Sequence, residues 1–325
     1  MISVALCTYN GSKYLNQQLR SIALQTRKVD EVVICDDGSS DNTLEIIEHY
    51  SKEVNFPVYV FQNQTNLGST KNFERCLTLC NGDYIFLSDQ DDAWYPDKVE
   101  KIMQVFEGQP TIDVVFSNAM IMNGNSNPIG QTIWDEIEFT PELQNKWKNG
   151  KAHEILYNNF VVTGATMAVR KSALSNSMPF PTHIKDFIHD AWMALWYSLG
   201  NAITFIEEPL MYYRIHESQQ VGFGGKEEFV TLKSRFSRDR TLKLAPLQEK
   251  AETMLLLYQE LKQRPNIPDD KLVVLKRRME HFQMRSTLPA NRLLRVFPVL
   301  KDLVRGRYRF SSKDWWLPVV GDIIE

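Results

Sequence analysis

The chain has 325 residues, of which 43% are hydrophobic and 24% are charged, values typical of an ordinary soluble globular protein. This length suits one large domain with a second, smaller unit, and the composition excludes disordered and collagen-like chains. The net charge of -3 conceals an asymmetry, because residues 1–225 carry 16 Lys+Arg and 27 Asp+Glu (16 - 27 = -11), whereas residues 226–325 carry 21 and 13 (21 - 13 = +8). We therefore expect two domains, 1–225 and 226–325, that meet different partners.

Neither a membrane-spanning helix nor a secretory leader is predicted. No run reaches the roughly 18 apolar residues that a span needs, and strand-like sequence follows Met1 directly. The sequence therefore predicts a cytoplasmic protein. Four cysteines, Cys7, Cys35, Cys76 and Cys80, lie in apolar segments without the second pair that a zinc site needs, so we interpret them as small buried hydrophobic residues.

Up to residue 118, β-rich runs alternate with helical patterns, which predicts a mostly parallel sheet with helices on both faces. The expected strands are Ile2–Cys7, Glu31–Cys35, Val58–Gln62, Tyr84–Ser88 and Asp113–Asn118. Ser12, Asp41 and Ser69 are expected to cap the three helices between the first four strands. Pro96 fits the first turn of a fourth helix, where its missing N–H costs nothing.

The pattern changes after residue 122. Residues 123–155 mix Asn, Gly, Pro, Trp and charge, so we expect a long insertion rather than a core element. A β-rich run at 160–170 follows, then a helix near 190–199 and two separate strands at 202–206 and 212–216. Residues 226–325 are expected to be helical, with prolines dividing the helices.

Polar residues follow each of the first four expected strands. They are Thr8-Tyr9-Asn10-Gly11, Asp36-Asp37-Gly38-Ser39, Asn66-Leu67-Gly68 and Asp89-Gln90-Asp91-Asp92. Each alone is explained by turn formation, since Asn, Asp, Gly and Ser are common turn residues. In an open parallel sheet, however, ligands bind beyond the carboxyl ends of the strands, so four such segments on one edge indicate a binding site.

The acidic run at 89–92 indicates a divalent cation. Three carboxylates within four residues repel one another unless a positive charge compensates them. Mg²⁺ is commonly held by one or two carboxylates together with substrate phosphates, which suits a short acidic turn. Asp89 and Asp91 share one face of an extended segment, and Asp92 can reach the same point from the next turn. The alternative is a solvated capping turn before the helix at Pro96.

The N-terminal part resembles the family 2 glycosyltransferases of the GT-A fold. The resemblance covers about residues 1–220 and rests on the order of four segments, which are Ser3–Asn10, Val33–Thr43, Asn66–Gly68 and Leu87–Asp92. It implies an α/β GT-A domain followed by a helical C-terminal region. It also implies a nucleotide-sugar donor held with Mg²⁺ or Mn²⁺.

The resemblance also implies roles for individual residues. The donor-binding residues would be Thr8, Tyr9, Asn10, Asp37, Gly38, Asn66, Gly68, Lys71, Asp89 and Arg214, and the metal ligands Asp91, Asp92 and His216. Lys71 and Arg214 would contact phosphate, although Lys71 could equally be a solvated lysine, and His216 could equally be structural. Asp190 would deprotonate the acceptor hydroxyl in an inverting transfer, with His189 a neighbour rather than the base. The alternative for Asp190 is a carboxylate favoured by the helix dipole.

The segment from Asn66 to Glu74, together with His189-Asp190, resembles the bacterial rhamnosyltransferases of this family. This implies dTDP-rhamnose as donor and a hydroxyl of a cell-surface polysaccharide or lipid-linked glycan as acceptor, with UDP-hexoses as the alternative donors. A catalytically silent nucleotide- or polysaccharide-binding scaffold remains a competing hypothesis. A nucleotidyltransferase and a Rossmann dehydrogenase are disfavoured, because Thr8-Tyr9-Asn10-Gly11 lacks the glycine-rich phosphate loop.

The basic C-terminal region has two interpretations. Its segments Asn291–Phe297 and Leu300–Arg305 interleave Lys and Arg with apolar residues, and Trp315-Trp316-Leu317 follows. This pattern suits a helix on an anionic bilayer, which would place the protein peripherally on the inner face of the cell membrane. It also suits ordinary core helices or a contact in a homodimer. Nucleic-acid binding is disfavoured because no recognised motif accompanies the charge.

Overall fold

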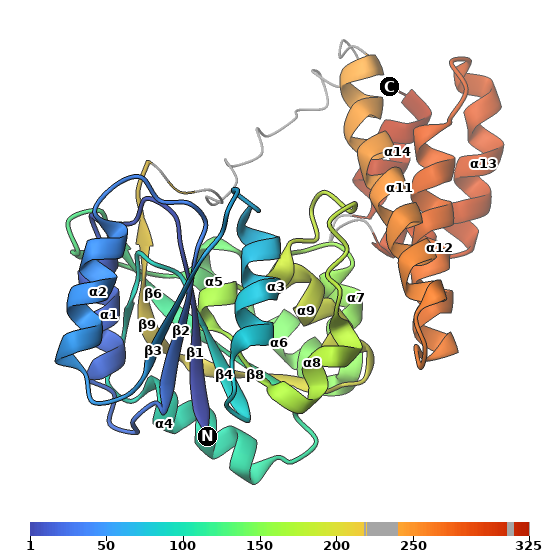
Figure 1. Ribbon diagram of the computed structural model, residues 1–325. Helices are drawn as coiled ribbons and strands as arrows, with labels where there is room; N and C mark the ends of the chain where they lie inside the picture. The colour runs from blue at the N-terminus through green and yellow to red at the C-terminus, as the bar shows by residue number, and fades with distance from the viewer. Residues whose placement is uncertain (218, 220–239, 311–314, 325) are drawn as a thin grey trace. The chain divides into compact units, whose positions relative to one another are not determined.

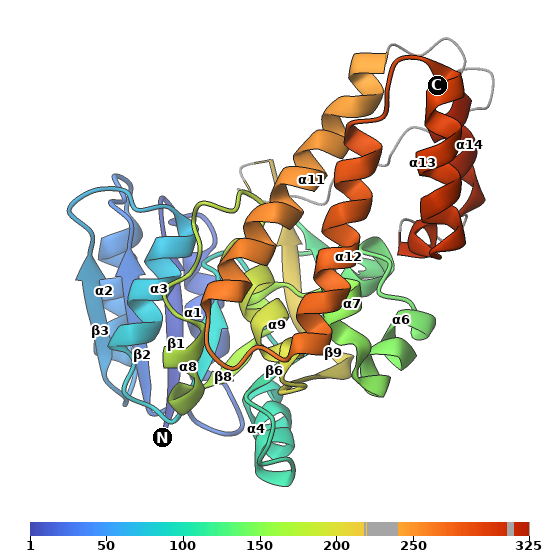
Figure 2. The ribbon, with the colours of Figure 1, turned by 90° about the vertical axis from the view of Figure 1, so that its right-hand side faces the viewer.

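The computed structural model describes residues 1–217, 219, 240–310 and 315–324. The chain divides into two compact units, Met1–Phe223 and Gly224–Glu325, and each is described by itself (Figures 1 and 2). Within the described residues, no helix is both long enough and apolar enough to cross a bilayer.

The first unit is built on one curled, mixed sheet. Its strands are β1 (Ile2–Thr8), β2 (Glu31–Asp36), β3 (Val58–Gln62), β4 (Tyr84–Ser88), β5 (Ala93–Trp94), β6 (Val114–Asn123), β7 (Pro128–Thr132), β8 (Ala168–Arg170) and β9 (Ile203–Ile215). The order is β3-β2-β1-β4-β8-β6-β9-β5, with β7 paired to β6. Strands β1 to β4 are parallel to one another, whereas β8 is antiparallel to both β4 and β6 and β5 is antiparallel to β9. The predicted α/β class is therefore confirmed, with the second half of the sheet mixed.

Helices cover both faces of this sheet. They are α1 (Leu15–Ala23), α2 (Thr43–Glu53), α3 (Ser69–Leu79), α4 (Lys98–Gly108), α5 (Ile133–Glu136), α6 (Pro141–Lys146), α7 (Ala152–Leu156), α8 (Lys171–Ser177) and α9 (His189–Leu199). Both views show α1 and α2 on one face and α3 with α9 on the other. Every residue of β1 and β2 is buried, because both faces of these strands are covered. The loops at the carboxyl ends of the strands remain free to form a site.

The expected helix starts were wrong by one or two residues. The first helix begins at Leu15 with Tyr14 as N-cap, and Ser12 instead donates its backbone N–H to Asp41. Gly68, with φ 77°, precedes the third helix at the position expected for Ser69. Pro96 lies outside the fourth helix, which begins at Lys98. None of these three helices has a side-chain hydrogen bond at its N-cap, so the types of capping residue did not locate the starts.

The segment 123–155 was wrongly expected to lie outside the core. It forms β7, α5, α6, the helical turn η1 (Trp147–Lys151) and α7. Trp134, Phe139 and Trp147 are at most 6% exposed and pack edge-on around Phe116 and Phe205, with ring centroids 5.2 to 6.2 Å apart where they meet Phe116. Edge-to-face aromatic pairs contribute about 0.5–1.5 kcal/mol beyond their buried area, so this segment completes the core beside β6 and β9.

Two further expectations about strands need correction. The β-rich run at 160–170 contains only the three-residue strand β8, preceded by the turn η2 (Gly164–Thr166). The runs at 202–206 and 212–216 are one strand, β9, which continues through Glu207-Glu208-Pro209 with irregular register against β6. A β-bulge tolerates proline where the regular ladder would not. The prediction for the cysteines is confirmed, since all four are buried and free.

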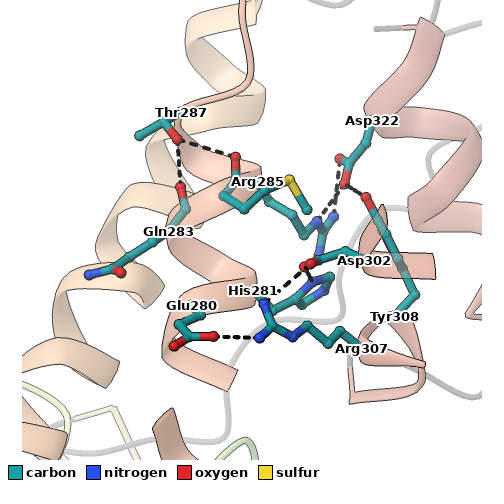
Figure 3. A network of polar contacts seen from close by, with 10 residues as sticks. Glu280, His281, Gln283, Arg285, Thr287, Asp302, Arg307, Tyr308 and Asp322 are labelled. Carbon is teal, nitrogen blue, oxygen red and sulfur yellow. Dashed lines mark hydrogen bonds and ion pairs between the residues drawn. The ribbon is translucent and has the colours of Figure 1, made fainter. Parts of the chain in front are cut away.

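The described part of the second unit is helical. It contains α11 (Arg240–Gln263), α12 (Asp269–Ser286), α13 (Arg292–Val304), the turn η3 (Arg307–Phe310) and α14 (Trp316–Ile324). A small apolar core joins Leu288, Val299, Tyr308 and Val319. Beside it lies a buried polar network in which Asp322 accepts hydrogen bonds from Arg285 Nε at 2.7 Å and Tyr308 Oη at 2.8 Å (Figure 3). Charged groups therefore stabilise the interior of this unit together with apolar ones.

Candidate active site

The first two strand-end turns are joined by hydrogen bonds. Thr8 Oγ1 donates to Asp36 Oδ2 at 2.8 Å, and the side chains of both residues are buried. Asn10, at φ 49°, donates its backbone N–H to Ser39 Oγ and accepts through Oδ1 from the backbone N–H of Ser40. These contacts hold the predicted donor-binding residues of β1 and β2 on one edge of the sheet.

Asp37 fixes the third turn. Its carboxylate accepts from the backbone N–H groups of Leu67 at 2.7 Å and Gly68 at 2.9 Å and from Asn63 Nδ2 at 2.7 Å. The Asn66 side chain donates to the Asp37 carbonyl at 3.2 Å. Asp37 is 4% exposed, so in this structure it organises the loop that carries Asn66 and Gly68.

Gln90 connects the acidic run to the first turn. Its side-chain amide accepts from Tyr9 N at 2.8 Å and donates to Tyr9 O at 3.0 Å, which is a two-point contact with the backbone. A Cβ on Gly11 would collide with Gln90 Oε1. Gly11 is therefore required by this close approach, and Tyr9, which is 43% exposed, is held beside the acidic run.

The three carboxylates of the run occupy different environments. Burial, together with the charges of Asp91 and Asp190, raises the pKa of Asp89 to about 7, and the charge of Lys98 opposes this increase. Burial also raises the pKa of Asp92 well above its ordinary value. Asp92 Oδ1 accepts from the backbone N–H of Arg214 at 3.0 Å, but its buried Oδ2 has no hydrogen-bond partner among the described residues. The protein thus assembles negative charge that it compensates only in part.

Asp91 meets His216 directly. Asp91 Oδ2 lies 2.8 Å from His216 Nε2, although 125 residues separate the two in sequence. The short strand β5 follows the acidic run and pairs Ala93 with Tyr212 of β9, which brings the end of β9 beside Asp91. The His216 ring packs at 4.9 Å from the ring of Tyr14. The structure therefore brings together two of the three predicted metal ligands.

Lys98 is a buried cation near the run that sequence reasoning missed. It is 0% exposed, and its Nζ donates to the Ala165 carbonyl at 2.6 Å and lies 4.3 Å from the centre of the Trp94 ring. Burial lowers the pKa of Lys98 to about 7, opposed by the charges of Asp92 and Asp89. A buried lysine near two carboxylates offsets part of their repulsion when no other cation is present.

Arg214 has a different environment from the one expected of a phosphate-binding residue. Its side chain is 0% exposed and donates to the Asp91 carbonyl at 2.6 Å, to Gln17 Oε1 at 2.7 Å and to Ser126 Oγ at 2.9 Å. The guanidinium also stacks over the Tyr14 ring at 4.3 Å. Since its donors are engaged within the protein, Arg214 orients the backbone of the acidic run, and a phosphate contact would require it to leave these partners.

Lys71 and Asp190 approach the same edge from helices α3 and α9. Lys71 is half-exposed and pairs with Glu74 at 2.7 Å, so it is engaged although accessible. Asp190, in the first turn of α9, accepts from Gly164 N at 2.9 Å through Oδ2 and from its own neighbour Ala191 N at 2.7 Å through Oδ1. The charge of Asp190 also contributes to the raised pKa of Asp89.

His189 lies behind Asp190 rather than in front of it. The ring is 5% exposed and stacks on Phe73 at 4.1 Å. Burial lowers its pKa, and both ring nitrogens are without a hydrogen-bond partner among the described residues. A Cβ added to Gly164 would lie 2.7 Å from His189 Nε2 and 3.2 Å from Asp190 Cβ, so Gly164 is a packing requirement of this corner.

The donor atoms suit a cation that also binds a phosphate. Among the described residues, no group of three or more His, Cys, Asp and Glu side chains forms a complete metal site. The pair of Asp91 Oδ2 and His216 Nε2, with the unpartnered Asp92 Oδ2 nearby, offers oxygen and imidazole ligands without closing the coordination sphere. Such an incomplete set fits Mg²⁺ or Mn²⁺, whose remaining positions are commonly filled by diphosphate and water.

The fold and this edge define a class of protein. A mixed sheet with helices on both faces and an acidic turn after its fourth strand is the GT-A arrangement, and solved GT-A structures are similar to the chain. One is Staphylococcus aureus TarS 1–349 in complex with UDP-GlcNAc, at TM-score 0.56 and 19% identity, covering 99% of this chain and 80% of that one. Another is the mannosyltransferase PcManGT from Pyrobaculum calidifontis, in complex with GDP-Man and Mn²⁺, at TM-score 0.56 and 15% identity, covering 99% and 85%.

The family is shown by sequence. The family model described as glycosyl transferase family 2 matches residues 3–177, more than half of the chain, and the chain belongs to this family. A relative in Shigella flexneri, the dTDP-rhamnosyl transferase RfbG, is 28% identical over 247 residues, which are 72% of this chain and 77% of the relative. The glycosyltransferase GlyG of Streptococcus pneumoniae is 27% identical over 219 residues, 66% of this chain and 70% of the relative. The predicted family and fold are therefore confirmed.

Proposed function

We propose that the chain is an inverting, metal-dependent glycosyltransferase that takes a sugar from a nucleotide-sugar donor and transfers it to a hydroxyl group. The observation that carries this proposal is the meeting of Asp91 with His216, on the same edge as Asp190. A bound Mg²⁺ or Mn²⁺ would stabilise the negative charge that develops on the leaving diphosphate. Residues 1–225 form the catalytic domain in this proposal, and residues 226–325 a separate helical region.

The protein's own residues would perform the remaining steps. Thr8, Tyr9, Asn10 and the loop organised by Asp37 hold the nucleotide, and Asp91, Asp92 and His216 supply the metal ligands. Asp190 accepts the proton of the acceptor hydroxyl as the hydroxyl oxygen bonds to the anomeric carbon. The bond from that carbon to the diphosphate oxygen breaks, and the nucleoside diphosphate leaves with both electrons. Gly164 N–H holds the Asp190 carboxylate in the orientation for this step.

The donor we propose is dTDP-rhamnose, and the acceptor a hydroxyl of a cell-surface polysaccharide or lipid-linked glycan. The RfbG relative, described as a dTDP-rhamnosyl transferase, supports this donor. The TarS complex with UDP-GlcNAc favours a UDP-hexose as the second candidate. The shape of the pocket around the sugar would distinguish these donors. A panel of nucleotides and nucleotide sugars tests the two candidates, with thermal shift to measure binding and donor hydrolysis to measure reaction, each with and without Mn²⁺. Indifference to every nucleotide would contradict the proposal and support a scaffold function.

Two substitutions separate the proposed roles. Asp190→Asn is expected to abolish transfer and leave metal-dependent nucleotide binding intact, whereas Asp91→Asn is expected to weaken that binding itself. Asp186→Asn is the matched control, since Asp186 is an exposed carboxylate four residues before Asp190. Calorimetric titration of nucleotide with Mn²⁺ and a transfer assay measure the two effects. The reverse pattern would show that the base and the metal ligand are wrongly assigned.

A further inference from the structure

Two of the four charged side chains of helix α13, Arg295 and Asp302, are buried in the second unit. Asp302, 3% exposed, lies 2.9 Å from His281 Nδ1 and accepts from Arg307 Nη1 at 3.2 Å (Figure 3). Arg295, 4% exposed, donates to the carbonyls of Pro289 at 2.6 Å and Ala290 at 2.8 Å. These contacts satisfy charged groups that the helix buries, which fixes the orientation of the helix.

The other side of α13 is apolar and exposed. Leu293, Phe297, Leu300 and Val304 are 81%, 76%, 47% and 87% exposed. Their spacing of four, three and four residues aligns them in one stripe along the helix. Leu294, 63% exposed, lies beside this stripe. We call these five residues the α13 apolar face.

This helix buries Val299 in the apolar core of the unit, yet it also keeps a second, long apolar stripe on its outer side. A helix on a soluble core buries its apolar stripe and exposes its charges, because apolar area exposed to water costs about 25 cal/mol per Å². Rotating the exposed leucines inward would break the contacts of Asp302 with His281 and Arg307 and would remove Val299 from the core. An apolar stripe retained on the outside in this way indicates a binding surface.

The charges around the face are all positive. Arg292, Lys301, Arg305 and Arg309 are exposed, and the only acidic residue between 291 and 309 is the buried Asp302. A second copy of α13 would bring like charges together, which disfavours a homodimer through this surface. An anionic bilayer instead offers phosphate for the cations and acyl chains for the apolar stripe. Trp315 and Trp316, 40% and 48% exposed, are residue types that favour the headgroup region.

We propose that the α13 apolar face and its flanking cations bind the surface of an anionic lipid bilayer, with α13 lying in the plane of the headgroups. The binding is peripheral, because α13 has only 13 residues and about 20 are needed to span a membrane. It requires neither donor nor metal, so it is independent of the proposed transfer reaction. If the acceptor is lipid-linked, the same contact concentrates the enzyme at the surface that carries it.

Vesicle co-sedimentation of the full chain, without nucleotide or metal, tests this proposal. The wild-type protein is expected to sediment with vesicles that contain about one third phosphatidylglycerol and to remain in solution with pure phosphatidylcholine. Phe297→Ser is expected to lower the partition coefficient about tenfold or more, and Lys301→Gln about fivefold. Leu24→Ser, at an apolar residue of the first unit that is 70% exposed, is the matched control and should leave binding unchanged.

The outcomes are distinguishable. Absence of binding to the anionic vesicles, or binding that Phe297→Ser and Lys301→Gln both leave unchanged, would overturn the proposal. A wild-type dimer in light scattering that Phe297→Ser converts to monomer, without vesicle binding, would assign the face to a second copy and also overturn it. Since the substituted side chains are exposed, their unfolding curves should match that of the wild type, and donor hydrolysis by each variant should remain unchanged.

Discussion

Gly164→Ala should impair the chemical step through its effect on Asp190. The new Cβ would lie 2.7 Å from His189 Nε2, and ordinary contact begins at 3.4 Å, so the corner must open by about 0.7 Å. His189 is 5% exposed and stacked on Phe73, so it cannot yield easily. The strain therefore acts on the Gly164 N–H to Asp190 Oδ2 hydrogen bond of 2.9 Å. A displacement near 1 Å of a reacting group costs about 100-fold in rate, so we expect kcat to fall about 10- to 100-fold.

Steady-state transfer kinetics and calorimetry measure this effect together. The affinity for nucleotide with Mn²⁺ should stay unchanged, because the hydrogen bonds that hold the turns of Thr8, Asp37 and Gln90 do not involve Gly164. Gly200→Ala is the control at the other end of α9, since an added Cβ there meets no atom within 4 Å and φ is -91°. A Gly164→Ala protein with wild-type kcat, or with an equal loss of nucleotide affinity, would refute the role of this contact.

Three further predictions concern the supports of the site and of the helical unit. Hydrogen bonds from Ser12 and Thr43 lower the pKa of Asp41 to about 2 despite the opposing effect of burial, so Asp41 stabilises the fold above about pH 4 and loses this contribution as pH falls toward 2. Asp41→Asn should therefore lower the free energy of unfolding by about 1 kcal/mol at pH 7, and urea unfolding should show this difference vanish at low pH. A difference that stays constant with pH would contradict the linkage. Arg214→Lys should weaken metal-dependent nucleotide binding, because one ammonium group cannot replace the guanidinium contacts to Asp91, Gln17 and Ser126. An unchanged nucleotide affinity in calorimetry would exclude the role of Arg214 in orienting the acidic run. Asp322→Ala should destabilise the helical unit by about 3–5 kcal/mol, because it leaves the charge of the mostly buried Arg285 uncompensated. Glu48→Gln, at an exposed carboxylate, is the control. Equal urea midpoints for the two variants would contradict this stabilising role of Asp322.

The parallel half of the sheet could be predicted because each strand is a short apolar run that ends in a turn-forming segment. The expected strand Ile2–Cys7 is β1 to within one residue, and Tyr84–Ser88 agrees with β4. The segment 123–155 could not be predicted, because Trp134, Phe139 and Trp147 follow no single period and pack against Phe116 and Phe205 from distant strands. The runs at 202–206 and 212–216 were not recognised as one strand, because the place of Glu207-Glu208-Pro209 in a bulged strand depends on the register against β6.

At the site, the sequence reveals residue types but not their partners. Asp91 and His216 could each be selected from motifs, but their 2.8 Å separation depends on the pairing of β5 with β9. Lys98 follows Pro96-Asp97 and looks like an exposed helix residue, so only the structure reveals its burial near Asp92 and Asp89. Gln90 and Gly164 were missed for the same reason, since their roles are contacts with the backbone or packing of distant segments.

The two-residue strand β5 has a consequence for how the protein is made. It lies at the end of the sheet order, and its ladder partner is β9, the last strand in sequence among the described residues. On the ribosome, β1 to β4 can assemble while the acidic run still lacks the backbone N–H of Arg214 and the ring of His216. Nascent chains that end before residue 216 would therefore carry the negatively charged turn without its partners. The candidate site would form late in synthesis, when β9 enters between β6 and β5.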